Sequence, residues 1–244
     1  GKQGGNTVRA LILPTIVYVA FSTSSHAQDK VELETAPLST ESSQFDIAFG
    51  LAFVSDYISE GVSLTQNKPA VQGYIEASYD MFYAGTWISN IRTDDVADAE
   101  IDLYAGIRPT FGDLSLGLGY THYYYPKDPT DFGEVNVTAS YAFTDQFNAG
   151  GTYYHDIFVD TDWLQVEAAL KDLPLKLSVS GSLGTDFGSY GFDTHDIAWD
   201  LGVSRTFAET FTVDLRYYDS NVDRSRVVLK LSFDTSWSAI SGAE

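Results

Sequence analysis

The sequence predicts an all-β fold: a transmembrane, antiparallel, up-and-down β-barrel of twelve strands that follows a cleaved signal peptide. Three observations lead to this prediction. The first residues have the pattern of an export signal, apolar and polar residues alternate along most of the chain, and the connections between the alternating segments are short and long in turn. A soluble β-sandwich has no reason to sort its connections by length.

The N-terminal residues have the three parts of a secretory signal peptide. Lys2 and Arg9 precede the apolar run Ala10–Phe21, and the small residues of Ser25-His26-Ala27 follow it. A transmembrane helix is the alternative, but it needs about 20 apolar residues, and this run is shorter and contains Pro14. The pattern therefore favours export with cleavage.

We expect residues 1–27 to be removed between Ala27 and Gln28, and residues 28–44 to form a flexible periplasmic leader. The mature protein should then begin at Gln28. Intact-mass measurement of the exported protein tests this, and a mass that still includes residues 1–27 would contradict it.

Alternation with a period of two begins at Phe45 and predicts strands with one apolar and one polar face. In the eight clearest segments, no charged residue falls on the apolar side. The barrel is expected over 45–233, with a C-terminal tail over 234–244. The expected strands are 45–62, 70–79, 82–91, 99–110, 114–125, 134–143, 147–156, 163–171, 175–185, 195–206, 210–218 and 225–233.

The connections that follow the even-numbered strands are tight, and those that follow the odd-numbered strands run longer. The tight ones are Asp80-Met81, Gly112-Asp113, Thr144-Asp145, Asp172-Leu173-Pro174 and Ala208-Glu209, and the long ones include 126–133 and 186–194. This pattern is typical of an antiparallel barrel with both termini on the tight-turn side.

The apolar face is expected to contact lipid and the polar face to line the lumen. A soluble barrel would have the opposite arrangement, with its apolar face inside. An uncharged face suits lipid, since one Lys or Arg at the bilayer midplane costs about 2–4 kcal/mol. An even number of strands also lets the sheet close, which leaves no unpaired edge in hydrocarbon.

Composition excludes several functions. The chain has 34 acidic and 14 basic residues and a formal net charge of −20, so nucleic acid is not an expected partner. It has no cysteine, which excludes disulfides, thiolate metal sites and a cysteine nucleophile. We expect neither a cofactor nor a metal ion. The expected location is the outer membrane of a Gram-negative bacterium.

Enzymatic chemistry finds little support in the sequence. His122, His155 and His195 lie at strand ends on the long-loop side, but no Gly-x-Ser-x-Gly motif supplies a nucleophile for a lipid hydrolase. Aspartates crowd the outer loops without matching an EF-hand. These aspartates form either a solvated acidic rim or weak sites for Ca²⁺ or Mg²⁺ ions that bridge to lipopolysaccharide.

Charged residues on the polar face are the candidate lumen lining. They form either a ladder of salt bridges that plugs a narrow barrel or a transverse field across a small water-filled pore. The candidates are Glu76, Glu100, Asp102, Arg108, Glu134, Glu167, Lys171, Lys176, Asp200, Asp214, Arg216, Arg226 and Lys230, and Asp46 and Asp196 share the same face.

The N-terminal third contains a set of short motifs within residues 50–106. They are 52–57 (AFVSDY), 61–63 (GVS), 69–73 (PAVQG), 82–90 (FYAGTWISN) and 100–106 (EIDLYAG). These motifs resemble the TorF-type family of porin-like outer-membrane proteins of proteobacteria, whose transported substrate is largely undefined, and the resemblance implies an outer-membrane barrel. One departure is Glu60, which stands before Gly61 where that family usually has Arg, so a basic gate near the first loop is not expected here.

Together these features predict a non-enzymatic, porin-like channel for passive diffusion of small hydrophilic solutes, with weak selectivity for cations. A barrel enzyme that acts on lipid and a closed structural or adhesive barrel are the alternatives. The expected partners are outer-membrane lipid and lipopolysaccharide, the diffusing solutes and the barrel-assembly machinery.

Overall fold

The computed structural model describes residues 45–93, 97–126, 132–158, 160–186 and 196–241. The expected signal peptide 1–27, its cleavage point between Ala27 and Gln28, and the leader 28–44 lie outside these residues, as does His195.

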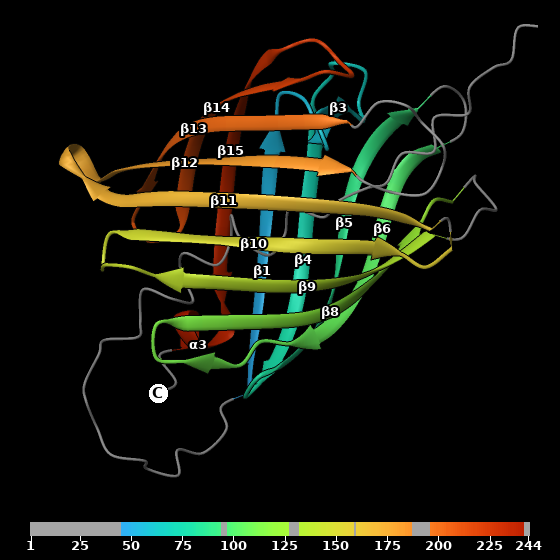
Figure 1. Ribbon diagram of the computed structural model, residues 1–244. Helices are drawn as coiled ribbons and strands as arrows, with labels where there is room; N and C mark the ends of the chain where they lie inside the picture. The colour runs from blue at the N-terminus through green and yellow to red at the C-terminus, as the bar shows by residue number, and fades with distance from the viewer. Residues whose placement is uncertain (1–44, 94–96, 127–131, 159, 187–195, 242–244) are drawn as a thin grey trace, which may run out of the picture.

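Twelve long strands form one closed antiparallel barrel, which confirms the predicted fold class (Figure 1). Each long strand pairs with its neighbour in the chain, and the first pairs with the last, with Leu51 opposite Phe233. The sheet therefore has no free edge among these strands. The strands are β1 (Phe45–Val54), β4 (Ala70–Tyr79), β5 (Phe82–Thr93), β6 (Ala97–Ile107), β8 (Leu114–Tyr124), β9 (Phe132–Ala142), β10 (Phe147–Asp156), β11 (Thr161–Leu173), β12 (Leu177–Asp186), β13 (Ile197–Phe207), β14 (Phe211–Ser220) and β15 (Arg226–Ser236).

The remaining elements are short. The two-residue strands β2 (Ile58–Ser59) and β3 (Val62–Ser63) pair with each other, and β7 (Thr110–Phe111) extends the edge of β8. The helical turns are η1 (Pro174–Lys176) and α3 (Trp237–Ser241). Within the residues that the structure describes, no helix is long and apolar enough to cross a membrane.

Most expected boundaries differ from the observed ones by one to three residues, and three of the differences are described here. The first strand does not run to residue 62, because the chain leaves the wall after Val54. The ninth expected strand begins at Leu177 rather than 175, since Leu175 and Lys176 have φ of 67° and 56° and form the turn after Pro174. The last strand runs to Ser236, past the expected end at 233.

The apolar face points outward, as predicted. Leu51 is 64% exposed on β1, and Leu215 is 55% exposed on β14. Exposed leucine, isoleucine, valine and aromatic side chains recur on the same face of every long strand. A continuous exposed apolar surface of this kind is far larger than the patches of soluble monomers, and it is typical of a lipid-facing barrel.

Aromatic side chains gather where the tight turns lie. Phe143 stacks near Phe147 across one turn with ring centroids 5.5 Å apart, and Phe211 lies 5.2 Å from Phe233. Phe45, at the start of β1 on the same rim, is 61% exposed. Aromatic girdles occupy the interfaces of membrane barrels, so this rim fits one membrane–water boundary.

Candidate functional site: an inward hairpin and the acidic lumen beside it

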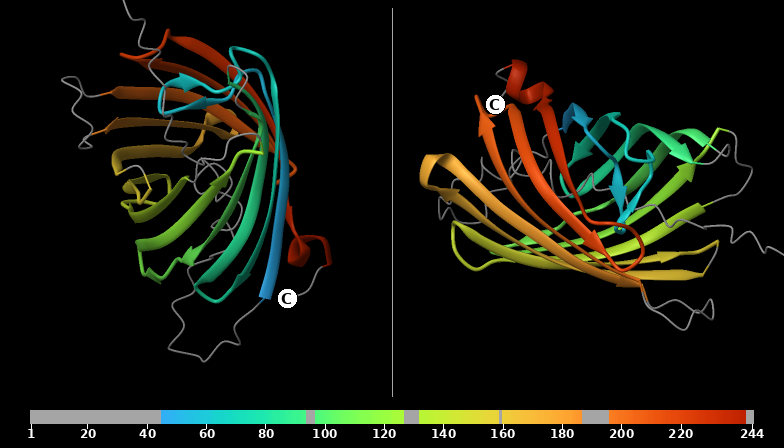
Figure 2. Two further views of the ribbon diagram at one scale, coloured as in Figure 1. Left: turned by 90° about the vertical axis from the view of Figure 1, so that its right-hand side faces the viewer. Right: turned by 90° about the horizontal axis from the view of Figure 1, so that it is seen from above.

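The segment between β1 and β4, residues 55–69, folds inside the barrel instead of outside it. It contains the β2–β3 hairpin, and both views in Figure 2 place this hairpin within the curved wall. We call residues 55–69 the inward hairpin. Because it follows the end of β1 that lies opposite the tight turns, it occupies the long-loop mouth of the barrel.

The inward hairpin contacts both sides of the barrel wall. Toward β14, the hydroxyl of Ser220 donates to the carbonyl of Gly61 at 3.0 Å. Toward β5, the amide of Arg92 donates to the carbonyl of Leu64 at 2.7 Å. Strands β15, β1 and β4 separate these two contacts in the sheet, so the segment bridges a wide arc of the wall and narrows the lumen.

The tip of the hairpin is a two-residue turn that requires glycine at its second position. Glu60 and Gly61 both have positive φ, 46° and 78°, which is the geometry of a type I′ hairpin turn. A Cβ atom on Gly61 would lie 2.4 Å from the Cβ of Ser220. Gly61 thus allows both the turn and its close approach to the wall.

A buried ion-pair network fixes the base of the hairpin. Arg226 at the start of β15 lies 3.5 Å from Asp56 and 2.8 Å from Asp223. Burial opposes ionisation of Asp223, but hydrogen bonds from Arg226 and from the amides of Arg224 and Ser63 outweigh it, so the pKa of Asp223 is below its ordinary value. Arg226 therefore anchors the hairpin rather than standing free in the lumen.

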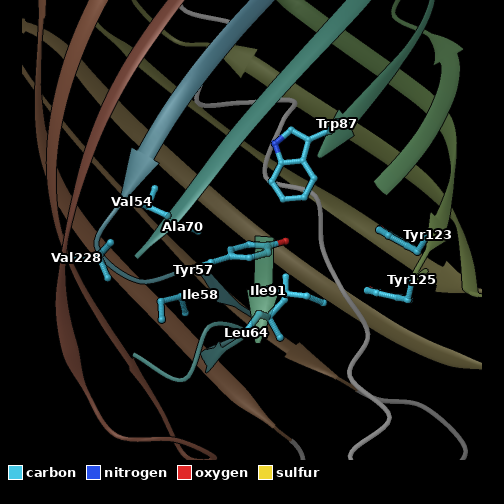
Figure 3. Close-up of a cluster of buried hydrophobic side chains, with 10 residues drawn as sticks. All are labelled: Val54, Tyr57, Ile58, Leu64, Ala70, Trp87, Ile91, Tyr123, Tyr125 and Val228. Atoms are coloured by element: carbon cyan, nitrogen blue, oxygen red, sulfur yellow. The ribbon is translucent and has the colours of Figure 1, made fainter. Parts of the chain in front are cut away.

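Apolar and aromatic packing completes the anchoring. Figure 3 shows Tyr57 of the hairpin between Val54, Ala70 and Val228 on one side and Tyr123 and Tyr125 on the other. The ring of Tyr57 meets that of Trp87 edge to face, with centroids 5.5 Å apart. This cluster is the main buried core of the described residues, and it lies inside the lumen.

Three predicted lumen acids lie together beside this cluster. Glu100 and Asp102 of β6 are each 0% exposed, and Glu134 of β9 is 2% exposed. Tyr57 and Tyr125 donate to Glu100 at 3.2 and 3.3 Å, and Tyr123 donates to Glu134 at 2.5 Å. Both carboxylate oxygens of Asp102 are buried without a hydrogen-bond partner.

Glu60 adds a further carboxylate at the hairpin tip. One of its oxygens is buried without a partner, as is one oxygen of Glu167 on β11. Burial, with the nearby charges of Glu134, Asp186 and Asp196, raises the pKa of Glu60 well above its ordinary value. The hairpin tip therefore faces an acidic stretch of the wall.

The predicted lumen arginines are paired with acids elsewhere. Arg216 binds both Asp200 and Asp214, the latter at 3.0 Å, and donates to the hydroxyl of Ser180 at 2.7 Å. The guanidinium packs so closely over Gly202 that a Cβ there would lie 2.6 Å from its Cζ. Arg216 of β14 therefore pairs with Asp200 of the preceding strand, β13.

A second pair lies nearer the tight turns. Arg108, directly after β6, binds Glu76 of β4, and its guanidinium carbon lies 4.0 Å from the centre of the Tyr83 ring. Asp46, at the start of β1, instead accepts from the hydroxyl and amide of Ser238 in α3, at 2.6 and 2.9 Å. These acids are therefore satisfied locally.

The three predicted lumen lysines differ from one another in position. Lys230 of β15 is the register partner of Asp214. Lys171 lies beside the register shift between Leu170 and Leu173. Lys176 is exposed in turn η1 and not on a strand, so its expected inward position in the wall was wrong.

The described histidines do not form a hydrolase triad. His155 lies 2.9 Å from Asp162, and His122 lies 3.4 Å from the hydroxyl of Tyr120. Neither of these two histidines is hydrogen-bonded to a serine in the described part of the chain. Across the same residues, no group of three or more histidine, aspartate or glutamate side chains is arranged to hold a metal ion.

Sequence reasoning missed the inward hairpin, and with it the roles of Asp56, Tyr57 and Trp87. Two signals were present in the sequence. Alternation stops after Val54, and Ile58-Ser59-Glu60-Gly61-Val62-Ser63 has β-forming residues on both sides of a turn ending in glycine. Both signals indicate a separate small hairpin rather than a longer wall strand.

The closed barrel, its apolar exterior and its partly filled polar interior define a porin-like protein. The chain belongs to the Gcw_chp family, described as "Bacterial protein of unknown function (Gcw_chp)", whose model matches residues 39–240. No match was found among curated proteins. The resemblance to the TorF-type family stays a prediction.

Two solved structures with a similar fold are of the KdgM porin. The KdgM porin is 9% identical with a TM-score of 0.58, over 77% of this chain and 98% of that one. The KdgM porin in complex with disordered oligogalacturonate is 10% identical with a TM-score of 0.57, over the same shares. At these identities, the likeness establishes the fold alone.

Proposed function

We propose that this protein is an outer-membrane channel for passive diffusion of small hydrophilic solutes, and that it prefers cations. The closed barrel with its exposed apolar face supports a membrane location, and the N-terminal export pattern supports delivery across the inner membrane. Twelve strands lie between the filled eight-stranded barrels and the open sixteen-stranded porins, which favours a narrow pore.

The observation that carries the preference for cations is the uneven pairing of lumen charges. Arg108, Arg216 and Arg226 each bind at least one acid. In the described chain, no lysine, arginine or histidine pairs with the acids beside the inward hairpin, which are Glu60, Glu100, Asp102, Glu134 and Glu167. When they are ionised, unbalanced carboxylates at a constriction concentrate cations and repel anions. Because burial raises the pKa of Glu60, the preference for cations should grow as the pH rises.

This charge pattern leads us to propose solutes that differ in charge from the oligogalacturonate bound by the KdgM porin. The neighbouring complex holds oligogalacturonate, which is a chain of carboxylated sugars and therefore anionic. At the hairpin, where Glu60 and Glu134 lie, an anionic chain would find no basic side chain among the described residues that pairs with these acids. We therefore propose neutral or cationic solutes for this channel. Non-enzymatic action, lipid and lipopolysaccharide around the apolar face, and insertion by the barrel-assembly machinery belong to the same proposal.

Reversal potentials in a KCl gradient test the selectivity. The wild-type channel in a planar bilayer should give a cation-selective sign near 0.1 M, fading toward about 1 M as the screening length falls from about 10 to 3 Å. Glu134→Gln should reduce the selectivity, whereas Glu209→Gln, the same change at an exposed tight turn, should leave it unchanged. An anion-selective sign at low salt would overturn the preference for cations.

A further inference from the structure

We propose that Asp102, with Glu100 and Glu134, forms a binding site for the primary ammonium group of an organic cation. This inference rests on the proposed function and deepens it, because it names the class of solute that the lumen would select. The site lies on β6 and β9, beneath Tyr57 of the inward hairpin.

Asp102 is the observation that points to a missing cation. Its side chain is completely buried, and neither oxygen has a hydrogen-bond partner. A buried carboxylate without a partner is strongly disfavoured, whereas an ammonium ion placed between its oxygens would supply both hydrogen bonds and charge. No basic side chain in the described residues fills that role.

The neighbours of Asp102 fit an ammonium group. Its register partners are Trp87 on β5 and Tyr123 on β8, so aromatic rings flank the carboxylate on both sides. Aromatic rings attract organic cations through their faces and pack against the attached carbon chain. This combination of carboxylate and rings is poorly suited to an anion.

Two other acidic side chains lie close to Asp102. Glu100 and Glu134 already accept from tyrosine hydroxyl groups, and both lie close enough to Asp102 to interact with its charge. An ammonium group has three N–H donors, and the two unpartnered oxygens of Asp102 can accept from them, while Glu100 and Glu134 add acidic groups nearby. The tyrosine hydroxyls hold the two glutamates in place for this arrangement.

A metal ion fits less well. Ca²⁺ requires six to eight oxygens at about 2.3–2.6 Å. The described residues contain no group of three or more acidic or histidine side chains placed to hold a metal. Hydrogen bonds from an ammonium group are longer, at about 2.7–2.9 Å, and the attached alkyl chain can pack against the aromatic rings. The site therefore favours an organic ammonium over a bare metal ion.

Equilibrium binding tests this inference without relying on conduction. Isothermal titration of the refolded, full-length protein in detergent at low ionic strength should show saturable binding of 1,4-diaminobutane. Binding of 1,4-butanediol, which has the same chain without charge, should be absent. Asp102→Asn should weaken diamine binding about tenfold or more, while Glu76→Gln, at a lumen acid paired with Arg108, should bind like the wild type. Each variant is first checked for the heat-modifiable migration of a folded barrel.

Absence of saturable diamine binding, unchanged binding by folded Asp102→Asn, or tighter binding of CaCl₂ than of the diamine would each overturn the ammonium site. Different results would refute the proposed channel and the proposed site. A barrel that conducts but does not bind the diamine refutes only the site, whereas one that binds the diamine but does not conduct keeps the site and refutes the channel.

Discussion

Removing the inward hairpin should increase the single-channel conductance about twofold or more and weaken the preference for cations. Val54 and Ala70 are direct register partners at the ends of β1 and β4, so an Asn-Gly turn in place of 55–69 can join these strands. The wall would keep its pairing, while the peptide that bridges β14 and β5 inside the lumen would be gone. A wider lumen with fewer constricting acids passes more current with less discrimination.

Planar-bilayer recording of the hairpin-deleted protein beside the wild type measures this effect. Asn67→Gly is a matched control, because Asn67 is exposed on the same segment and has a φ of 60°, which glycine adopts readily. The control should keep the wild-type conductance. Equal conductance of the deleted and intact proteins would show that the hairpin does not limit the lumen.

Leu215→Arg should strongly impair membrane assembly, whereas Thr212→Arg on the same strand should be tolerated better. Leu215 is 55% exposed on the outer face of β14, where an arginine would face hydrocarbon at a cost of about 2–4 kcal/mol near the midplane. Thr212 lies on the opposite face, where its hydroxyl is 2.9 Å from that of Thr206. An arginine there would reach the lumen and avoid lipid.

The fraction of heat-modifiable, folded barrel in isolated outer membranes measures assembly. Leu116→Arg and Ser115→Arg on β8 form a second pair with the same expectation. Leu116 is 38% exposed, whereas the hydroxyl of Ser115 is hydrogen-bonded to that of Thr110. If both members of each pair lost the folded barrel equally, the assignment of the inner and outer faces would be wrong.

The wall of the barrel was predictable from sequence for a physical reason. A strand in a closed barrel has one face in lipid and one in the lumen, so the period of two must persist along its length. Strands β4 and β10 match the expected ranges 70–79 and 147–156, even though glycine and tyrosine blur their alternation. The tight turns that link the wall strands were equally visible.

The interior was less predictable, because its contacts join residues that are distant in sequence. Alternation shows that Asp102 and Arg216 face inward, but it cannot show that Arg216 binds Asp200 while Asp102 has no partner. Nor could it place Tyr57 against Glu100. These contacts depend on the position of the inward hairpin, which is determined by packing across the whole lumen.

Single-channel current of the wild-type protein tests the central claim, that this barrel is a channel, most directly. The folded protein, verified by its heat-modifiable migration, is added to a planar bilayer in about 1 M KCl. At this salt concentration, screening suppresses charge selectivity, so the conductance depends mainly on the size of the opening. Discrete conductance steps, larger in the hairpin-deleted protein, are the predicted result. Bilayers that stay silent with folded wild-type and hairpin-deleted protein would contradict the channel and favour a closed structural barrel.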